Sequence, residues 1–180
     1  MGFSIKSQLG GDSTLLNASQ ATNFNFKIEG GEFADDEINR INSLETKHKV
    51  LDRVNAIKEK GGRLVFDMVD NKIFYENLMM LDGHLPIIIA YLLLEQLNTS
   101  DTKLKDLVKK VSEINPLQFN PERAFSIYAY KVKNLLTSVA LGLMPKKAWD
   151  GRYDANGGYM VIKESGDILC YHFYDRNRFE

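Results

Sequence analysis

A lysine with polar neighbours on one face of a predicted strand is the first place in this sequence where catalysis can be expected. Residues 2–9 alternate apolar and polar side chains, which predicts a β-strand with Lys6 in its middle. Because side chains at i and i±2 point to the same side of a strand, Lys6 shares its face with Ser4 and Gln8. Such a lysine either protects an edge strand from aggregation or steadies a water or a developing phosphate charge beside a metal ion. The residues alone leave both interpretations open and favour the edge strand.

The loop that follows is rich in hydrogen-bonding side chains. A Gly-Gly pair at residues 10–11 ends the first strand, and a second alternating segment begins at residue 22. Hydroxyl and amide groups are side chains that hydrogen-bond DNA phosphates and base edges. In this loop they belong to Ser13, Thr14, Asn17, Ser19, Thr22 and Asn23.

Charge is unevenly distributed along the chain although the total is nearly balanced. The 180 residues include 23 Lys and Arg against 24 Asp and Glu, a formal net charge of -1. Residues 29–45 hold six acids and one base, whereas residues 116–152 hold six bases and two acids. A basic surface can neutralise DNA phosphates, but on its own it is more often a solvated helix face. The six bases are Arg123, Lys131, Lys133, Lys146, Lys147 and Arg152.

Several other classes of protein find no support. Hydrophobic residues make up 44% and charged residues 26% of the chain, as in an ordinary globular domain. One cysteine excludes a disulfide framework, and we expect Cys170 to be a packed thiol on a strand. The three histidines lack zinc-site spacing, and no GxxxxGK(S/T), GxGxxG or GxSxG motif is present. The longest apolar run, residues 85–95, is too short to cross a bilayer, so we expect a soluble, cytoplasmic protein without membrane contact.

The remaining patterns predict mixed α and β structure with helices in the majority. Alternation predicts strands over residues 22–28 and 62–70 and a hairpin over residues 157–174 with its turn at ESGD. Capping residues, acids and terminal glycines mark the helices. We expect one helix to start at Asp35, a second to span 48–60 before two glycines, and two more to span 71–81 and 87–94. A further helix should span 103–114 with a cap at residues 99–101, and the last should span 121–143 after Asn120.

Three segments resemble the HpaII-type restriction endonucleases, a branch of the PD-(D/E)xK nuclease superfamily. The first is GFSIKSQLGG, followed by STLLNAS and ATNF, and the second is DGHLPIIIAYLLLE. The third is WDGRYDANGGYMVIKESGDILCYHFYDRNRFE, which resembles that family's Gly-Gly-Tyr hairpin and its ending. The resemblance implies an α+β fold with an α/β nuclease-like core, in which a partial restriction-endonuclease-like sheet is joined to a helix-rich middle and a C-terminal β-hairpin.

The resemblance also implies the catalytic residues. It places Ser4, Ile5 and Lys6 at the (D/E)xK position, with Lys6 as the lysine that orients or activates the attacking water. The main-chain carbonyl of Ile5 would then ligate Mg²⁺, and Gln8 would assist the lysine and the metal site. The metal would activate the water and stabilise charge on the scissile phosphate.

Two features depart from the family pattern. Ser4 stands where most of the superfamily has an acid, and Glu29, Glu32 and Glu37 are candidate replacements. The upstream aspartate of the motif would precede residue 1. The family's proteins are longer at both ends, so we expect this chain to be the C-terminal-proximal portion of a larger nuclease, inactive alone. We expect a single domain over residues 1–180, with catalytic-core strands in 1–30, a helical region over 33–145 and a hairpin region over 150–180.

The resemblance implies that the function is Mg²⁺-dependent, sequence-specific hydrolysis of double-stranded DNA by a type II restriction enzyme. The relatives imply a CCGG-type site. The alternatives are a DNA-binding remnant without catalysis and a helical interaction or assembly domain. A homodimer is left open, and a cognate DNA methyltransferase is implied by the family alone. The expected DNA contacts are Ser7, Ser13, Thr14, Asn17, Ser19, Asn23, Arg123, Lys131, Lys133, Lys146, Lys147 and Arg152.

Overall fold

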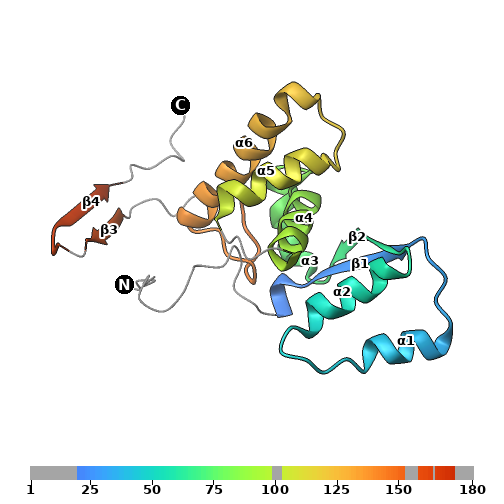
Figure 1. Cartoon of the computed structure of the whole chain (residues 1–180). Helices are drawn as coiled ribbons and strands as arrows, with labels where there is room; N and C mark the ends of the chain where they lie inside the picture. The colour runs from blue at the N-terminus through green and yellow to red at the C-terminus, as the bar shows by residue number, and fades with distance from the viewer. Residues whose placement is uncertain (1–19, 99–102, 153–157, 164, 173–180) are drawn as a thin grey trace.

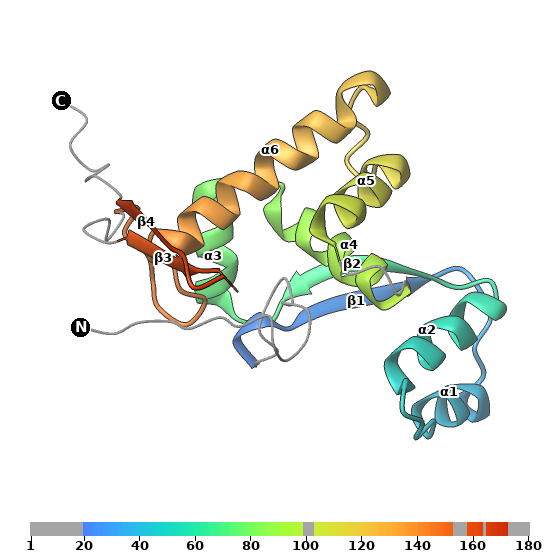
Figure 2. The same cartoon turned by 60° about the vertical axis from the view of Figure 1, so that its left-hand side comes forward.

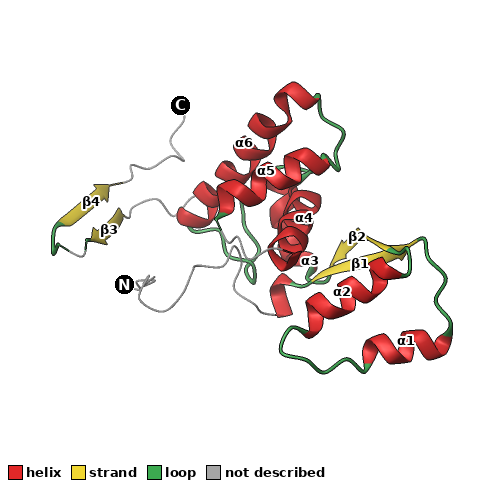
Figure 3. Ribbon diagram, in the orientation of Figure 1, coloured by secondary structure: helices red, strands yellow, loops and turns green. Residues whose placement is uncertain are grey.

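The computed structural model describes residues 20–98, 103–152, 158–163 and 165–172 (Figure 1). Within these ranges helices are in the majority, and the strands form two separate antiparallel pairs (Figure 3). The expected α+β class is therefore confirmed. In chain order the elements are a 3-10 helix (Gln20–Thr22), β1 (Phe24–Glu29), α1 (Asp35–Asn42), α2 (Lys49–Glu59), β2 (Arg63–Val69), α3 (Lys72–Leu81), α4 (Leu85–Asn98), α5 (Leu104–Ile114), α6 (Pro121–Ala140), β3 (Gly158–Ile162) and β4 (Ile168–His172).

Helix α4 lies at the centre of the core because it is apolar on nearly every side. A helix with apolar residues all round is stable in water only where other elements cover its faces. This confirms the buried helix predicted around residues 87–94. The buried residues of α4 are Leu85, Pro86, Ile88, Ile89, Ala90, Leu92 and Leu94.

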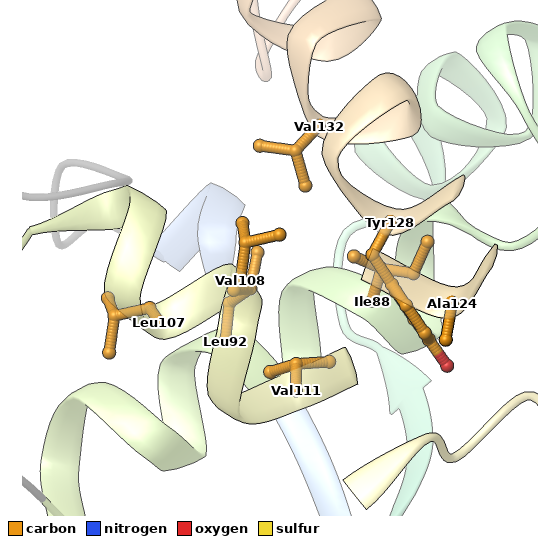
Figure 4. Packing of buried hydrophobic residues seen from close by; sticks show 8 residues of the cluster. All are labelled: Ile88, Leu92, Leu107, Val108, Val111, Ala124, Tyr128 and Val132. Atoms are coloured by element: carbon orange, nitrogen blue, oxygen red, sulfur yellow. The ribbon is translucent and has the colours of Figure 1, made fainter. Parts of the chain in front are cut away.

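Two apolar clusters meet at α4 and fix the elements around it. In the first cluster, α4 packs against α5 and α6 through Ile88, Leu92, Leu107, Val108, Val111, Ala124, Tyr128 and Val132 (Figure 4). In the second cluster, it packs against β2, α3 and α6 through Leu85, Ile89, Val69, Phe74, Leu78 and Leu135. Helix α6 contributes to both clusters, so packing determines its position relative to both α3 and α5.

The first sheet pairs β1 with β2, and α1 and α2 lie between these two strands in the sequence. The ladder starts with Phe24 opposite Val69. Phe24 packs against the second cluster, whereas Asn25 and Lys27 on the alternate positions are exposed. The predicted alternation is thus confirmed at these positions. Ile28 departs from it, since its side chain is 47% exposed at the far end of the strand.

Helices α1 and α2 form a small lobe at one end of the molecule, away from α6 (Figure 2). A third apolar cluster holds this lobe on β2. It consists of Ile41, Ala56 and Ile57, with Phe33, Leu44 and Leu64 packed against it.

The start of α6 confirms its predicted capping signal, whereas the start of α5 does not. The Asn120 side chain accepts a hydrogen bond of 3.0 Å from the backbone N–H of Glu122 and so caps α6. Helix α5 begins at Leu104 with Lys103 at the N-cap, so the cap expected at residues 99–101 was wrong. Because lysine has no acceptor for such a bond, α5 depends on its buried side chains instead.

The terminal hairpin was predicted correctly in type and position. Strands β3 and β4 pair from Gly158 opposite His172 to Ile162 opposite Ile168. The turn contains Gly166 at φ +86°, a backbone conformation that glycine adopts without strain. The expectation that Cys170 is a packed thiol was wrong, because its side chain is exposed.

Among the described residues, no single helix has both the length and the apolar character to cross a membrane. Helices α3 and α4 together would meet these criteria, but they are bent by 109° at the break between them. The side chains that make α4 apolar are mostly buried inside the molecule. Packing in the core therefore accounts for this apolar stretch.

Replacing Leu92 by alanine is expected to lower the free energy of unfolding by about 2–5 kcal/mol, because it leaves a cavity between α4 and its neighbours. Leu92 is 1% exposed. Leu97→Ala removes the same atoms from the same helix at a position that is 40% exposed, and it should cost far less. Urea unfolding of both variants measures the difference. Equal losses would show that α4 is not the centre of the core.

Candidate nucleic-acid interface

Helix α6 and the segment after it carry all six bases of residues 116–152. One face of α6 is buried through Ala124, Tyr128, Val132 and Leu135, and the opposite face is exposed to solvent. Arg123 and Lys133 are exposed there, and neither forms an ion pair with a described residue. Their charges are therefore available to an anionic partner.

Lys131 lies on the inner side of α6 and has a different role. Its side chain is 14% exposed, and its ammonium forms an ion pair with Asp82 at the C-cap of α3. Asp82 also accepts a hydrogen bond of 2.9 Å from the backbone N–H of His84. Lys131 thus links α6 to the corner between α3 and α4. Its partly buried position differs from the exposed position expected of a DNA contact.

The ion pair also determines the charge state of Asp82. Burial opposes ionisation of this carboxyl group, but the hydrogen bonds from Lys131 and from the His84 backbone, with the charge of Lys131, outweigh it. The pKa of Asp82 is therefore lowered from its ordinary value of 3.8. At neutral pH Asp82 is an anion that keeps Lys131 in place.

A buried asparagine on α3 fastens the segment that carries Lys146 and Lys147. Asn77 is 2% exposed. Its side-chain amide donates to the backbone carbonyls of Met144 at 3.1 Å and Lys147 at 2.9 Å. Its side-chain oxygen accepts from the backbone N–H of Trp149 at 2.9 Å. Both ends of one side chain therefore fix the course of the backbone over residues 144–149, which we call the basic loop.

The residues after the basic loop are ordered by their own hydrogen bonds. The indole N–H of Trp149 donates to the backbone carbonyl of Arg152 at 2.6 Å. The Asp150 carboxylate accepts from the backbone N–H of Arg152 at 2.9 Å. The side chains of Lys146, Lys147 and Arg152 are exposed along this tethered stretch. This arrangement presents three positive charges on backbone that is held to α3.

Most of the site residues expected at the front of the chain lie outside the described residues. These are Ser4, Ile5, Lys6, Ser7, Gln8, Ser13, Thr14, Asn17 and Ser19. Asn23 is described and exposed, and its backbone carbonyl accepts from the N–H of Asp70 at 3.1 Å. The structure thus places the C-terminal bases on α6 and on the segment after it, and the catalytic strand stays a prediction.

Carboxylates of the described part of the chain do not fit a metal site. Within these residues no three His, Cys, Asp or Glu side chains gather closely enough to hold an ion. Asp67 instead binds Lys27 at 2.6 Å, and Asp70 accepts from the Asn25 side chain at 2.5 Å. These two carboxylates therefore link β1 to β2 and to the residue after it.

Sequence reasoning missed Asn77, Asp82 and Trp149. Asn77 carried a usable signal, because it lies three residues after Phe74 and four before Leu81, on the apolar face of a predicted helix. A polar group on a buried face needs partners, and these are usually backbone groups. Its partners lie about 70 residues away in the chain, beyond the reach of local patterns.

Comparison with known proteins decides the family. The family model described as HpaII restriction endonuclease matches residues 1–180. The chain belongs to the HpaII restriction endonuclease family. It is 44% identical over 180 residues to the type II restriction enzyme HpaII of Haemophilus parainfluenzae. The alignment covers 100% of this chain and 49% of that relative, so the chain spans about half the length of the curated relative. No solved structure matches it.

Replacing Asp82 by asparagine tests the ion pair in this HpaII-family chain. At pH 7 the variant should be less stable by about 1–2 kcal/mol, because Lys131 loses its anionic partner. Since the pKa of Asp82 is lowered in the folded state, its contribution is complete above pH about 4 and is lost as the pH falls through the folded pKa. Urea unfolding at pH 7 and pH 3 measures this. If the variant and the wild type differ in unfolding free energy by the same amount at both pH values, the ion pair is contradicted. The double variant Asp82→Asn with Lys131→Met measures the coupling energy between the two side chains.

Replacing Asn77 by alanine is expected to release the basic loop. The variant loses three hydrogen bonds and leaves backbone groups unpaired, which should cost about 2–4 kcal/mol. Trp149 is the single tryptophan of the chain, so its fluorescence reports on the loop directly, and its emission should shift toward that of exposed indole. Asn134→Ala, at an exposed position of α6, is the matched control. An unchanged emission spectrum in Asn77→Ala would show that the loop is held in another way.

Proposed function

We propose that the protein containing this chain is a type II restriction endonuclease that cleaves double-stranded DNA at a specific short sequence. The observation that carries this proposal is the match of all 180 residues to the HpaII restriction endonuclease family. The relative that is 44% identical is named as a type II restriction enzyme. We further propose a recognition site of the CCGG type.

The basic region of the structure supports a DNA substrate. Arg123 and Lys133 on α6, with Lys146, Lys147 and Arg152 after it, are exposed, so they can neutralise phosphates. Lys131 is paired with Asp82, so we propose that it positions α6 beside the other bases. Ser7, Ser13, Thr14, Asn17, Ser19 and Asn23 are the proposed contacts from the front of the chain.

We assign the chemistry to the strand around Lys6. Lys6 would hold and orient the attacking water, with Gln8 beside it and Ser4 at the position usually taken by an acid. The main-chain carbonyl of Ile5 would be one ligand of Mg²⁺. When bound, Mg²⁺ would stabilise negative charge on the scissile phosphate. The proposal also includes a partial restriction-endonuclease-like sheet, a cytoplasmic location, a homodimer and a cognate methyltransferase.

Replacing Lys6 by alanine should abolish cleavage and leave DNA binding within a few-fold of the wild type. The loss should be about 10²–10⁴-fold, typical of a group that positions or activates a proton-transfer partner. The protein in the full length that its gene encodes is incubated with Mg²⁺ and a plasmid that contains CCGG, and the rate of linearisation is measured. Lys27→Ala on β1 is the control, because it removes another strand lysine that binds Asp67.

The same assay separates the alternatives. A wild-type protein that binds duplex DNA but does not cut it with Mg²⁺ would be a DNA-binding remnant without catalysis. A protein that binds no duplex even at low salt would be an interaction or assembly domain. Full cleavage by Lys6→Ala would remove Lys6 from the catalytic site and leave the endonuclease proposal standing.

A further inference from the structure

Five side chains form one exposed polar face along α6. Arg123, Ser126, Tyr130, Lys133 and Thr137 follow one another at spacings of three and four residues, so they share one side of the helix. All five are exposed, and Tyr130 is 64% exposed. We call this face the α6 stripe. We propose that the α6 stripe lies in the major groove of duplex DNA and contacts base edges. This inference rests on the proposed function and deepens it.

The back of α6 is held firmly enough to present this face in a fixed orientation. Tyr128 is 0% exposed, and its hydroxyl accepts from the backbone N–H of Leu117 at 3.1 Å and donates to the Asn115 side chain at 3.2 Å. Its ring packs against Phe119 at a centroid distance of 5.2 Å. Lys131 adds the ion pair to Asp82. A rigid element is what specific base recognition needs.

The charge around the α6 stripe favours a polyanion. No aspartate or glutamate occurs between Arg123 and Trp149 in the sequence. Arg123 and Lys133 form no ion pair with any described residue, and the nearby Asp82 is already bound to Lys131. Glu122 precedes the stripe, and from Arg123 onward α6 carries positive charge only, with the two charges of the stripe ten residues apart.

The dimensions of the stripe fit the groove. At about 1.5 Å per residue, Arg123 and Thr137 are about 21 Å apart along the helix axis, and Arg123 and Lys133 about 15 Å. The major groove is about 12 Å wide and admits an α-helix. Arg123 and Lys133 can thus reach phosphates while Ser126 and Tyr130 between them face the base pairs.

The polar side chains have the chemistry for reading bases. Ser126 and Tyr130 each offer a hydroxyl that both donates and accepts. The Thr137 hydroxyl donates to the backbone carbonyl of Lys133 at 2.9 Å, so it can still accept from a base amino group. Its methyl group can contact a thymine methyl. The composition favours DNA over a protein partner, because every side chain of the α6 stripe carries a hydroxyl group or a positive charge.

Selection from a pool of randomised DNA duplexes, in the absence of divalent metal, tests the inference without assuming a recognition site. The full-length wild type returns its own preferred sequence, which is then used as a probe beside a scrambled duplex of equal composition. A double variant, Ser126→Ala with Tyr130→Ala, should bind the preferred duplex about 10–100-fold more weakly and the scrambled duplex unchanged. Lys133→Ala should weaken both equally and lower the slope of log K against log salt by about 0.9.

Lys109→Ala is the matched control, because Lys109 is an exposed lysine on α5 and its loss changes the net charge equally. It should leave both affinities and the salt slope near wild type. Thermal unfolding and Trp149 fluorescence verify that each variant is folded. A double variant that keeps the wild-type preference overturns the inference, as does a changed oligomeric state in gel filtration without loss of DNA affinity. A wild type that binds no duplex overturns the proposed function as well.

Discussion

The burial of α4 is the constraint on which the rest of the structure depends. Its apolar residues cannot remain in water, so β2, α3, α5 and α6 pack around it in two clusters. Helix α6 joins both clusters, and this leaves it with one buried face and one exposed face. The basic surface is thus a consequence of apolar packing, because the same contacts that cover α4 turn Arg123 and Lys133 outward.

Apolar packing is not directional, whereas hydrogen bonds are, and α3 supplies the side chains that form them. Asn77 and Asp82 lie on the same helix or at its end, and both bind residues from the C-terminal half of the chain. Asp82 fixes α6 through Lys131, while Asn77 fixes the basic loop through backbone hydrogen bonds. A buried polar group left without partners costs free energy, so few alternative positions of the loop remain acceptable. Asn77 and Asp82, on or next to one helix, therefore fix the positions of α6 and of the basic loop.

Patterns local to the sequence predicted much of this fold. Asn120 and Pro121 marked the start of α6, the alternation at Phe24 marked β1, and the glycine-containing turn marked the hairpin. The structure could not be predicted where partners lie far apart in the chain. Asp82 is 49 residues from Lys131, so nothing near Lys131 distinguishes it from Lys133, which is exposed. The cap predicted for α5 was wrong for a related reason, since tertiary burial of Leu107 and Val111 replaces a capping residue.

The position of Asn77 has a consequence for the order in which the molecule folds. Its hydrogen bonds close loops of 67 to 72 residues, and closing a long loop costs more entropy than forming a helix or a hairpin. Helices α5 and α6, adjacent in the chain, pack through local contacts, which form early. The basic loop reaches its place only when α3 and the C-terminal segment have met, late in folding. A chain that is only partly folded therefore lacks the complete positive surface.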